Sequence, residues 1–340
     1  MDYQAYAEEI QEKLQRDDAW KKQYLGYAEA LIKNECNIKE RRKSFHKVEP
    51  LHVYTTIGMA QNNAYSFDMR YLGQSVATIT VSKDTANKSA TLSTKKMKIN
   101  NNTWFEYGTP IANEDWHNSI ASKDFRRYFK NIFREYLNNA TAKPLLPRQK
   151  EHMWESRLFS EFEKSKSDFK AILGIQPVSF AGCRFHMKTA LKGSSGEKDL
   201  SKKGGEIDVF CRQKNGNKLK LSIIEVKDEN KRSESLEVTM KQALAYTVFI
   251  RELLRSSQDN GSKWLKIWGV NETSIDIHLN RSLEFNAIVA MPYIRKETPD
   301  FIGKIVMLGD DKIYLHYLLV KSEGTGTFDP GNPLIVEKSF

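Results

Sequence analysis

Three ionisable side chains near the middle of the sequence have types and spacing suited to metal-assisted chemistry. Asp208 stands in the run GGEIDVF, and Glu225 and Lys227 stand in the run LSIIEVKD that follows an Asn-Gly step. Because Asn-Gly between two β-patterned runs is a strong hairpin signal, one strand is predicted over 206–213 and a second over 218–227. Side chains alternate faces along a strand, so Glu225 and Lys227 share a face. Two carboxylates and one ammonium meeting there could hold a divalent cation beside a water or a phosphate oxygen.

The second strand of this hairpin is predicted to be central in its sheet. Residues 221–226 are apolar apart from Ser222 and Glu225, which is typical of a strand covered on both faces. Burying Glu225 and Lys227 at its end costs free energy unless the two groups pair or bind a cation. Asp208, on the neighbouring strand, can bring a second carboxylate to the same point. A solvated or salt-bridged strand end is the alternative interpretation of these residues.

Asp208 followed by Glu225-Val226-Lys227 resembles the D-(x)n-E-x-K signature of the PD-(D/E)xK nuclease superfamily, which has the restriction-endonuclease-like fold. Gln242 and Tyr246, on a helix predicted over 233–256, are similar to the Q-x-x-x-Y element of its RecB-like branch. The resemblance implies that both side chains lie close to the active centre, while a packed structural pair is the alternative. The resemblance extends over the segment 148–293 and does not cover the first half of the chain.

The chain departs from the family pattern in two places. Ile207 rather than Pro precedes Asp208, a common variation in the superfamily, and Val209-Phe210 stand where RecB-type members often have Arg. No helicase motif accompanies the nuclease-like segment. The sequence therefore does not resemble a RecB protein as a whole.

The resemblance implies a metal-dependent deoxyribonuclease that hydrolyses phosphodiester bonds. Asp208, Glu225 and the Val226 carbonyl would hold Mg²⁺, with Mn²⁺ as a substitute, and Lys227 would orient or deprotonate the attacking water. The family often supplies a further acid from the helix before its sheet, which is predicted here over 150–169. The candidates on that helix are Glu151, Glu155, Glu161 and Glu163, of which Glu155 is preferred.

The predicted fold class is α+β or α/β, with a domain boundary in the proline-containing run 139–149. The second domain, 148–340, is expected to be a restriction-endonuclease-like mixed β-sheet flanked by helices in the order α-β-β-β-α-β. Its predicted elements are the helix 150–169, strands over 177–189, 206–213 and 218–227, the helix 233–256, a buried strand over 285–292 and further strands over 305–320.

The first half, 1–147, is expected to be an α+β domain that binds DNA or a partner protein. Its helical periodicity over 3–40 is interrupted at Asp17-Asp18, which predicts two helices. A small antiparallel sheet is predicted from β-rich runs at 53–57, 64–72, 75–82, 89–92 and 103–107. Lysines just before Trp104 could hold nucleic acid, and an edge strand protected by lysines explains them equally well.

A dense basic stripe is predicted on a helix over 119–139. Spacings of three and four place positive side chains on one surface of it, and contact with backbone phosphates is the functional interpretation. A solvated helix face is the alternative. The stripe consists of Lys123, Arg126, Arg127, Lys130 and Arg134. Lys202 and Lys203, in a polar loop predicted over 192–203, are the other candidates for DNA contact, and a simple flexible hairpin loop is the alternative.

Composition narrows the class of partner and the compartment. A net charge of +10 over 340 residues suits a polyanionic partner. Three widely spaced cysteines without a C-x-x-C pair favour a reducing compartment and disfavour structural zinc. The acidic amphipathic start does not resemble a signal peptide, and no apolar run approaches the length of a membrane span. A cytoplasmic protein is therefore expected.

A stand-alone endonuclease of the restriction or phage-defence type is the preferred function, and DNA is preferred over RNA through the resemblance alone. The alternative from another class is a catalytically inert nuclease-fold protein that binds nucleic acid or serves in assembly. The intact Asp208, Glu225 and Lys227 argue against that alternative. A homodimer and a protein partner for the first half are further expectations that the sequence leaves open.

Overall fold

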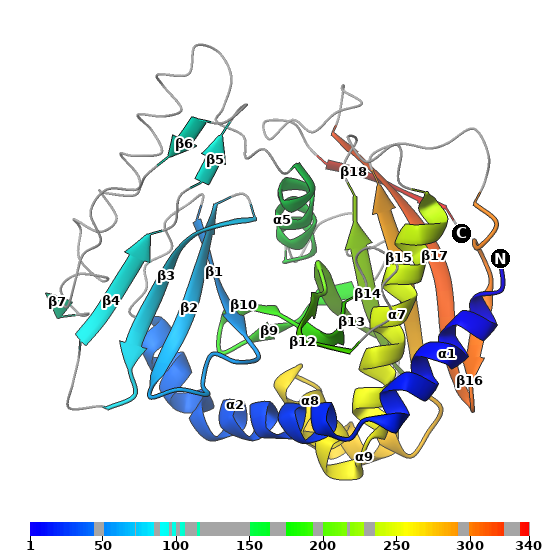
Figure 1. Cartoon of the computed structure of the whole chain (residues 1–340), viewed down its shortest axis with the longest axis horizontal. Coiled ribbons are helices and arrows are strands. Elements are labelled where there is room, and N and C mark those ends of the chain that lie inside the picture. Colours follow the sequence, from blue (N-terminus) through cyan, green and yellow to red (C-terminus); the bar gives the residue numbers. More distant parts are fainter. Residues whose placement is uncertain are drawn as a thin grey trace. The chain divides into compact units, whose positions relative to one another are not determined.

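The structure is a computed structural model that describes residues 1–43, 51–71, 73–84, 89–94, 97–99, 103–105, 114–115, 150–163, 175–192, 200–215, 218–227, 235–291, 299–322 and 334–339. Helices occur together with sheets of parallel and antiparallel strands, which confirms the general α+β class (Figure 1). Within these residues, every helix is too short or too polar to cross a membrane.

The chain divides into two compact units that interleave along the sequence. The first unit consists of Met1–Glu29, Arg157–Val178 and His186–Phe340, and the second consists of Ala30–Ser156 and Ser179–Phe185. The boundary predicted within 139–149 lies outside the described residues and stays a prediction.

The first unit is built on a mixed sheet with the strand order β16-β17-β15-β14-β13-β8, in which β18 also pairs with β17. The β14–β15 and β15–β17 pairs are parallel, whereas β13–β14 and β16–β17 are antiparallel. Residues 221–226 of β14 are all buried, as expected for a central strand. The bounds are β8 (Ile175–Pro177), β13 (Val209–Asn215), β14 (Lys218–Val226), β15 (Glu284–Met291), β16 (Ile305–Leu308), β17 (Asp311–Ser322) and β18 (Leu334–Ser339).

Helices cover this sheet and carry much of its core. α7 (Leu236–Arg255) contacts β14, β15 and β17, and α1 (Tyr3–Arg16) packs on α7 and β16 (Figure 1). α7 begins where the Ser235 side chain accepts the Val238 N–H, a typical N-cap. Two short helices that the sequence analysis did not predict, α8 (Gln258–Ile267) and α9 (Glu272–Leu279), follow α7.

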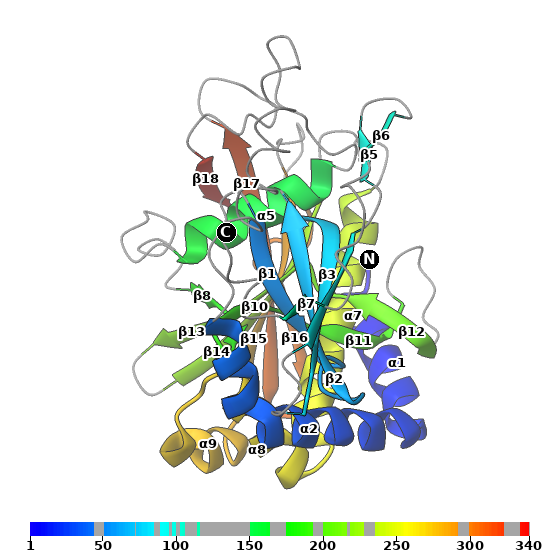
Figure 2. The same ribbon diagram turned by 90° about the vertical axis from the view of Figure 1, so that its left-hand side faces the viewer.

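The second unit contains an antiparallel sheet with the order β7-β4-β3-β2-β1-β10-β9, in which β1, β2 and β3 lie side by side (Figure 2). This confirms the predicted antiparallel sheet for the runs at 53–57, 64–72, 75–82 and 89–92, whereas the described part of the run at 103–107 is not part of it. Its bounds are β1 (Leu51–Thr56), β2 (Ala64–Tyr71), β3 (Gln74–Ser82), β4 (Ser89–Thr94), β7 (Glu114–Asp115), β9 (Ser179–Phe180) and β10 (Cys183–His186). A separate hairpin pairs β5 (Met97–Ile99) with β6 (Thr103–Phe105).

The predicted helices near the start and the middle of the chain are present. α1 ends at Arg16 and α2 (Ala19–Lys43) begins after the two aspartates, where the Asp17 carboxylate accepts the Ala19 N–H. The predicted break at Asp17-Asp18 is therefore confirmed. α5 (Lys150–Glu163) carries the expected buried stripe of Met153, Trp154, Leu158, Phe159 and Phe162.

Two strand predictions and one loop prediction were wrong in their extent. The single strand predicted over 206–213 is two strands, β12 (Leu200–Glu206) and β13, because the chain bends at Asp208 and changes pairing partner. Residues 200–203, predicted as the end of a loop over 192–203, belong to β12. The strand predicted over 177–189 is four short strands, including β11 (Lys188–Leu191). Ala181 at φ 52 and Gly182 at φ 77 turn the chain in that region.

Candidate metal centre

The carboxylates of Asp208 and Glu225 meet at one end of the β13–β14 hairpin. Val209 pairs with Ile224 in the antiparallel ladder, so the next step of the same register places Asp208 opposite Glu225. Directly opposed residues present their side chains on the same face. One carboxylate oxygen of Asp208 lies within 4.8 Å of one of Glu225. The two acids are therefore close enough to share a cation.

The main chain at the end of β14 is held from both sides. The Val226 N–H donates to Asp208 Oδ2 at 2.8 Å, and the Lys227 N–H donates to the Ala290 carbonyl on β15 at 2.9 Å. The N–H and C=O of one strand residue point to the same side. The Val226 carbonyl is thus directed toward the side of β14 on which Asp208 lies.

Lys227 and Glu225 form a buried ion pair. Lys227 Nζ donates to Glu225 Oε1 at 2.8 Å, and the side chains are 7% and 1% exposed. This burial excludes a solvated strand end. The pair is a salt bridge, which compensates the cost of removing both charges from water but adds little net stability. The bridge holds the ammonium and the Glu225 carboxylate in one fixed geometry.

The donor set of this centre suits a hard cation. The Asp208 and Glu225 carboxylates and the Val226 carbonyl offer oxygen atoms only, and oxygen ligands are those that Mg²⁺ and Mn²⁺ prefer. The two acids contribute two negative charges and Lys227 one positive charge. The residues present therefore fit the magnesium ion that the resemblance implies.

Gln242 and Tyr246 lie one turn apart on α7, and both are buried. The Tyr246 hydroxyl lies against the main chain of β12, because a Cβ added at Gly205 would come within 2.2 Å of Tyr246 Oη and 2.8 Å of the Leu191 carbonyl. Gly205 is three residues before Asp208, so this contact positions the strand that leads to the carboxylate. Gly205 was not among the predicted site residues, although the Gly204-Gly205 pair is a signal of close backbone approach.

A buried histidine that was not among the predicted site residues, His186, lies near the strand that leads to Asp208. The Ile207 N–H donates to the Met187 carbonyl at 3.0 Å, and His186 is the next residue along the chain from Met187. His186 Nδ1 lies 3.2 Å from Glu206 Oε2, and Lys188 Nζ lies 3.5 Å from Glu206 Oε1. The only signal for His186 was its place in an otherwise ordinary strand, and its neighbours come from tertiary pairing.

Glu155, the preferred acid of the preceding helix, belongs to the second unit. Its carboxylate is buried, 3.7 Å from Arg70 Nη1 and 3.3 Å from His152 Nδ1. Burial alone would lower the pKa of His152, but the Glu155 carboxylate outweighs it and raises that pKa. Arg70 also pairs with Asp68 at 2.8 Å. A metal-binding role for Glu155 stays a prediction.

The predicted DNA contacts fall largely outside the described part of the chain. Lys123, Arg126, Arg127, Lys130 and Arg134 lie among residues that the structure does not describe. Lys202 and Lys203 lie in β12, for which the structure describes the main chain at these two positions. These roles remain predictions from the sequence.

Comparisons of the chain with protein-family models, with curated proteins and with solved structures found no match.

Proposed function

We propose that the protein is a Mg²⁺-dependent nuclease that hydrolyses phosphodiester bonds in DNA, as a stand-alone endonuclease of the restriction or phage-defence type. The observation that carries the proposal is the approach of the Asp208 and Glu225 carboxylates to within 4.8 Å, with Lys227 bonded to Glu225. The D-(x)n-E-x-K resemblance selects the same three residues. DNA as the substrate rests on the resemblance alone.

The order of elements supports the restriction-endonuclease-like part of the proposal. After α5 and the short strands β8 to β12, the chain forms the β13–β14 hairpin, then the helices α7 to α9, and then β15, which lies parallel to β14. A hairpin, a helix and a parallel strand in this order are compatible with the arrangement that the resemblance implies. The strand ends that carry Asp208 and Glu225 lie together in this arrangement.

The residues of the chain would act as follows. Asp208, Glu225 and the Val226 carbonyl would hold the cation, and bound Mg²⁺ would polarise the phosphate and make the attacking water more acidic. Lys227 would orient that water and offset the charge that develops on the phosphorane. Its burial strengthens these interactions, because a charge acts more strongly where little water screens it. Tyr246 would keep β12, and hence Asp208, in place.

Asp208→Asn, Glu225→Gln and Lys227→Met test the three roles. Each is expected to slow Mg²⁺-dependent nicking of supercoiled plasmid by at least about 100-fold, since each removes a charge that acts in the transition state. Binding of the same DNA in EDTA should change little. The matched control is the exposed Lys304–Asp300 pair, whose ammonium and carboxylate lie 3.2 Å apart, replaced by the same types of residue.

Two results would contradict the nuclease proposal. One is nicking at the wild-type rate by a folded Lys227→Met variant, with folding checked by circular dichroism. The other is a wild-type protein that binds DNA and does not nick it with Mg²⁺ or Mn²⁺, as the inert nucleic-acid-binding alternative predicts. Parallel incubations with RNA would test the substrate class.

The acid from α5 is tested by a pair of variants one helical turn apart. Glu155→Gln is expected to raise the Mg²⁺ concentration needed for half-maximal cleavage by about tenfold, as the loss of a ligand or its support does. Glu151→Gln, one turn earlier on the same helix face, is the comparison. If Glu151→Gln alone raises the Mg²⁺ concentration needed for half-maximal cleavage, Glu151 and not Glu155 is the acid that supports metal binding.

A further inference from the structure

One face of the first unit's sheet is partly open to solvent near the start of β14 and β15. The strand registers align Lys220 with Glu284 and Lys312, and align Ser222 with Asn286 and Tyr314, so these side chains share a face. Ser222 and Glu225 are three residues apart in β14, which places Glu225 on the opposite face. The half-buried or exposed members, here called the open face, are Lys220, Glu284, Ile305, Met307, Lys312, Tyr314 and His316.

Two aromatic rings stand parallel on the open face. The Tyr314 and His316 rings are stacked at an interplanar angle of 8° with centroids 6.3 Å apart. Parallel rings on one face of a sheet offer π-faces on which a base can stack. On the open face, Lys220 Nζ also lies 4.0 Å from the Tyr314 centroid.

A buried polar chain fixes the His316 ring. Asn286 Nδ2 donates to Ser222 Oγ at 2.9 Å, and Asn286 Oδ1 lies 3.1 Å from His316 Nε2, which must then be the donor. Ser222 is fully buried and Asn286 is 6% exposed. Apolar residues could fill these positions without the cost of burying polar groups. The Ser222–Asn286–His316 hydrogen bonds therefore hold the His316 imidazole in one orientation.

The surroundings of the rings match a nucleic-acid strand. Lys220 and Lys312 supply positive charge, partly offset by Glu284, whose carboxylate lies 3.4 Å from Lys220 Nζ. Ile305 lies directly opposite Tyr314 in the β16–β17 ladder and is 49% exposed, which extends the apolar surface beside the ring. Aromatic faces with neighbouring positive charge are how proteins bind single strands without reading sequence.

We propose that Tyr314 and His316 form a stacking subsite for a base of single-stranded nucleic acid, with Lys220 and Lys312 beside its phosphates. The ligand class rests on the proposed nuclease function. Because the subsite lies on the opposite face of the sheet from Glu225, it holds a segment of strand outside the cleavage centre.

Tyr314→Leu and Tyr314→Phe test the stacking role by fluorescence anisotropy with a labelled short oligothymidylate in EDTA. The Leu variant keeps apolar bulk and loses the ring, so its affinity should fall roughly tenfold, while the Phe variant should bind as the wild type does. The loss should persist between about 50 and 200 mM salt, where phosphate contacts weaken. Ile277→Ala on α9, which removes a side chain that is 47% exposed, is the control and should have no effect.

Photocrosslinking provides a second readout that needs no variant. An oligonucleotide carrying 5-iodouracil should crosslink to Tyr314 or His316, as located by mass spectrometry. Equal affinity of the Leu and Phe variants, no binding by the wild type, or crosslinks confined to other residues would overturn the subsite. Competition by an apolar peptide and not by oligonucleotide would assign the open face to a protein partner and overturn it too.

The experiment separates this subsite from the nuclease proposal, because binding in EDTA does not require cleavage. Ring-dependent binding by a protein that never cleaves would leave the subsite standing and remove the nuclease. Cleavage that depends on Asp208 and Lys227, combined with ring-independent binding, would remove the subsite alone.

Discussion

Glu225 and Lys227 are buried together, and each compensates the charge of the other. Removing one partner of such a pair leaves an uncompensated buried charge, at a cost of about 3–5 kcal/mol. The pair therefore constrains both the fold and the candidate chemistry. Single replacements at these positions need a stability measurement beside every activity measurement.

Gly205 gives a residue-scale prediction that does not depend on catalysis. Gly205→Ala should lower the free energy of unfolding by about 1–3 kcal/mol, because the new methyl group meets the Tyr246 hydroxyl and the Leu191 carbonyl. Urea unfolding checks it. Gly26→Ala is the matched control, since a Cβ there has no atom within 4 Å, and in the interior of α2 it should stabilise by up to about 1 kcal/mol. Equal effects at both positions would contradict the contact.

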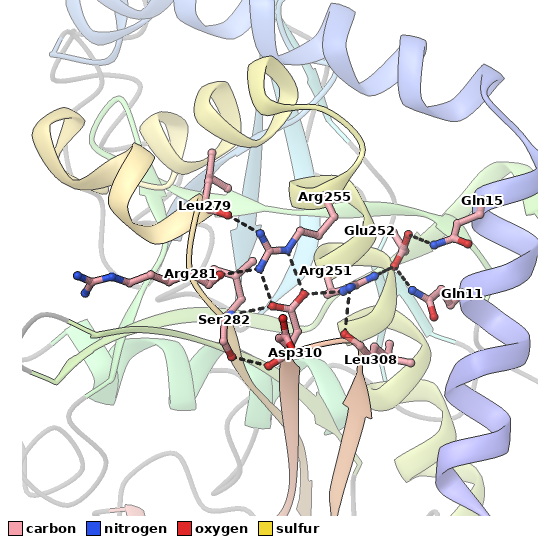
Figure 3. Close-up of polar contacts among 12 residues, drawn as sticks. Gln11, Gln15, Arg251, Glu252, Arg255, Leu279, Arg281, Ser282, Leu308 and Asp310 are labelled. Carbon is pink, nitrogen blue, oxygen red and sulfur yellow. Dashed lines mark hydrogen bonds and ion pairs between the residues drawn. The ribbon is translucent and has the colours of Figure 1, made fainter.

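At the scale of elements, Asp311 ties α7 to the beginnings of two strands. Its carboxylate accepts from Arg251 Nε at 2.8 Å, from Arg255 Nη2 at 2.6 Å and from the Leu283 N–H at 2.7 Å. Figure 3 shows Arg251 and Arg255, both from α7, in this group of contacts, together with Gln11 and Gln15 of α1. One buried carboxylate thus joins a helix to the parallel strands β15 and β17.

The Asp311 carboxylate has a pKa below its ordinary value. Burial alone would raise that pKa, but hydrogen bonds from Arg255, Leu283 and Arg251 outweigh it. A pKa lower in the folded than in the unfolded state stabilises the fold above the unfolded value of 3.8. This contribution is lost as the pH falls through the folded pKa.

Asp311→Asn should therefore destabilise the protein in a pH-dependent manner. At pH 7 the loss is expected to be about 3–5 kcal/mol, because two guanidinium groups lose their shared carboxylate. As the pH falls below the unfolded pKa of 3.8, the stabilisation by the wild-type carboxylate decreases, and it is lost once the pH passes the lower folded pKa, so the difference between the two proteins should shrink. Urea unfolding at neutral pH and near pH 3 measures both. A difference that is constant with pH would refute the assignment.

At the scale of the whole molecule, the first helix and the C-terminal half build one unit. The Gln4 side chain donates to the Met307 carbonyl at 2.6 Å and accepts the Met307 N–H at 2.9 Å, so it completes the main-chain bonds of that edge-strand residue. Gln11 and Gln15 donate to Glu252 on α7 at 3.0 and 3.2 Å. The stability of the unit that carries the candidate metal centre should therefore depend on α1, at the start of the chain.

Removal of residues 1–16 tests this dependence. The shortened chain should melt at least about 5 °C lower, because α7 and β16 lose the buried Tyr3, Ile10 and Leu14 side chains. Thermal unfolding followed by circular dichroism measures the shift. Gln23→Ala, in an exposed contact with Tyr27 on α2, should leave the melting temperature unchanged. An unaltered melting temperature after truncation would mean that α1 adds nothing to the unit.

Local pattern was sufficient for several elements. Alternation and the Asn-Gly step predicted the β13–β14 hairpin, and the periodicity of apolar residues predicted α1, α2, α5 and α7. The split at Asp208 was not predictable, because β12 and β13 read as one strand until each finds its own partner, β11 for one and β14 for the other. The division of 177–189 into four short strands around Ala181 and Gly182 was not predictable for the same reason.

The sequence by itself determined that Glu225 lies in the second strand of a hairpin, with Asp208 and Lys227 beside the ends of its two strands, since residue type and alternation act over a few neighbouring positions. Only the tertiary structure decided that the Asp208 carboxylate approaches that of Glu225, that Tyr246 contacts Gly205, and that Ser222, Asn286 and His316 form one hydrogen-bonded chain. Such contacts join distant positions of the chain: the Val226–Asp208 bond joins residues 18 positions apart, and the Asn286–Ser222 bond joins residues 64 positions apart. Their geometry depends on strand register and sheet order, which arise when distant segments pack together.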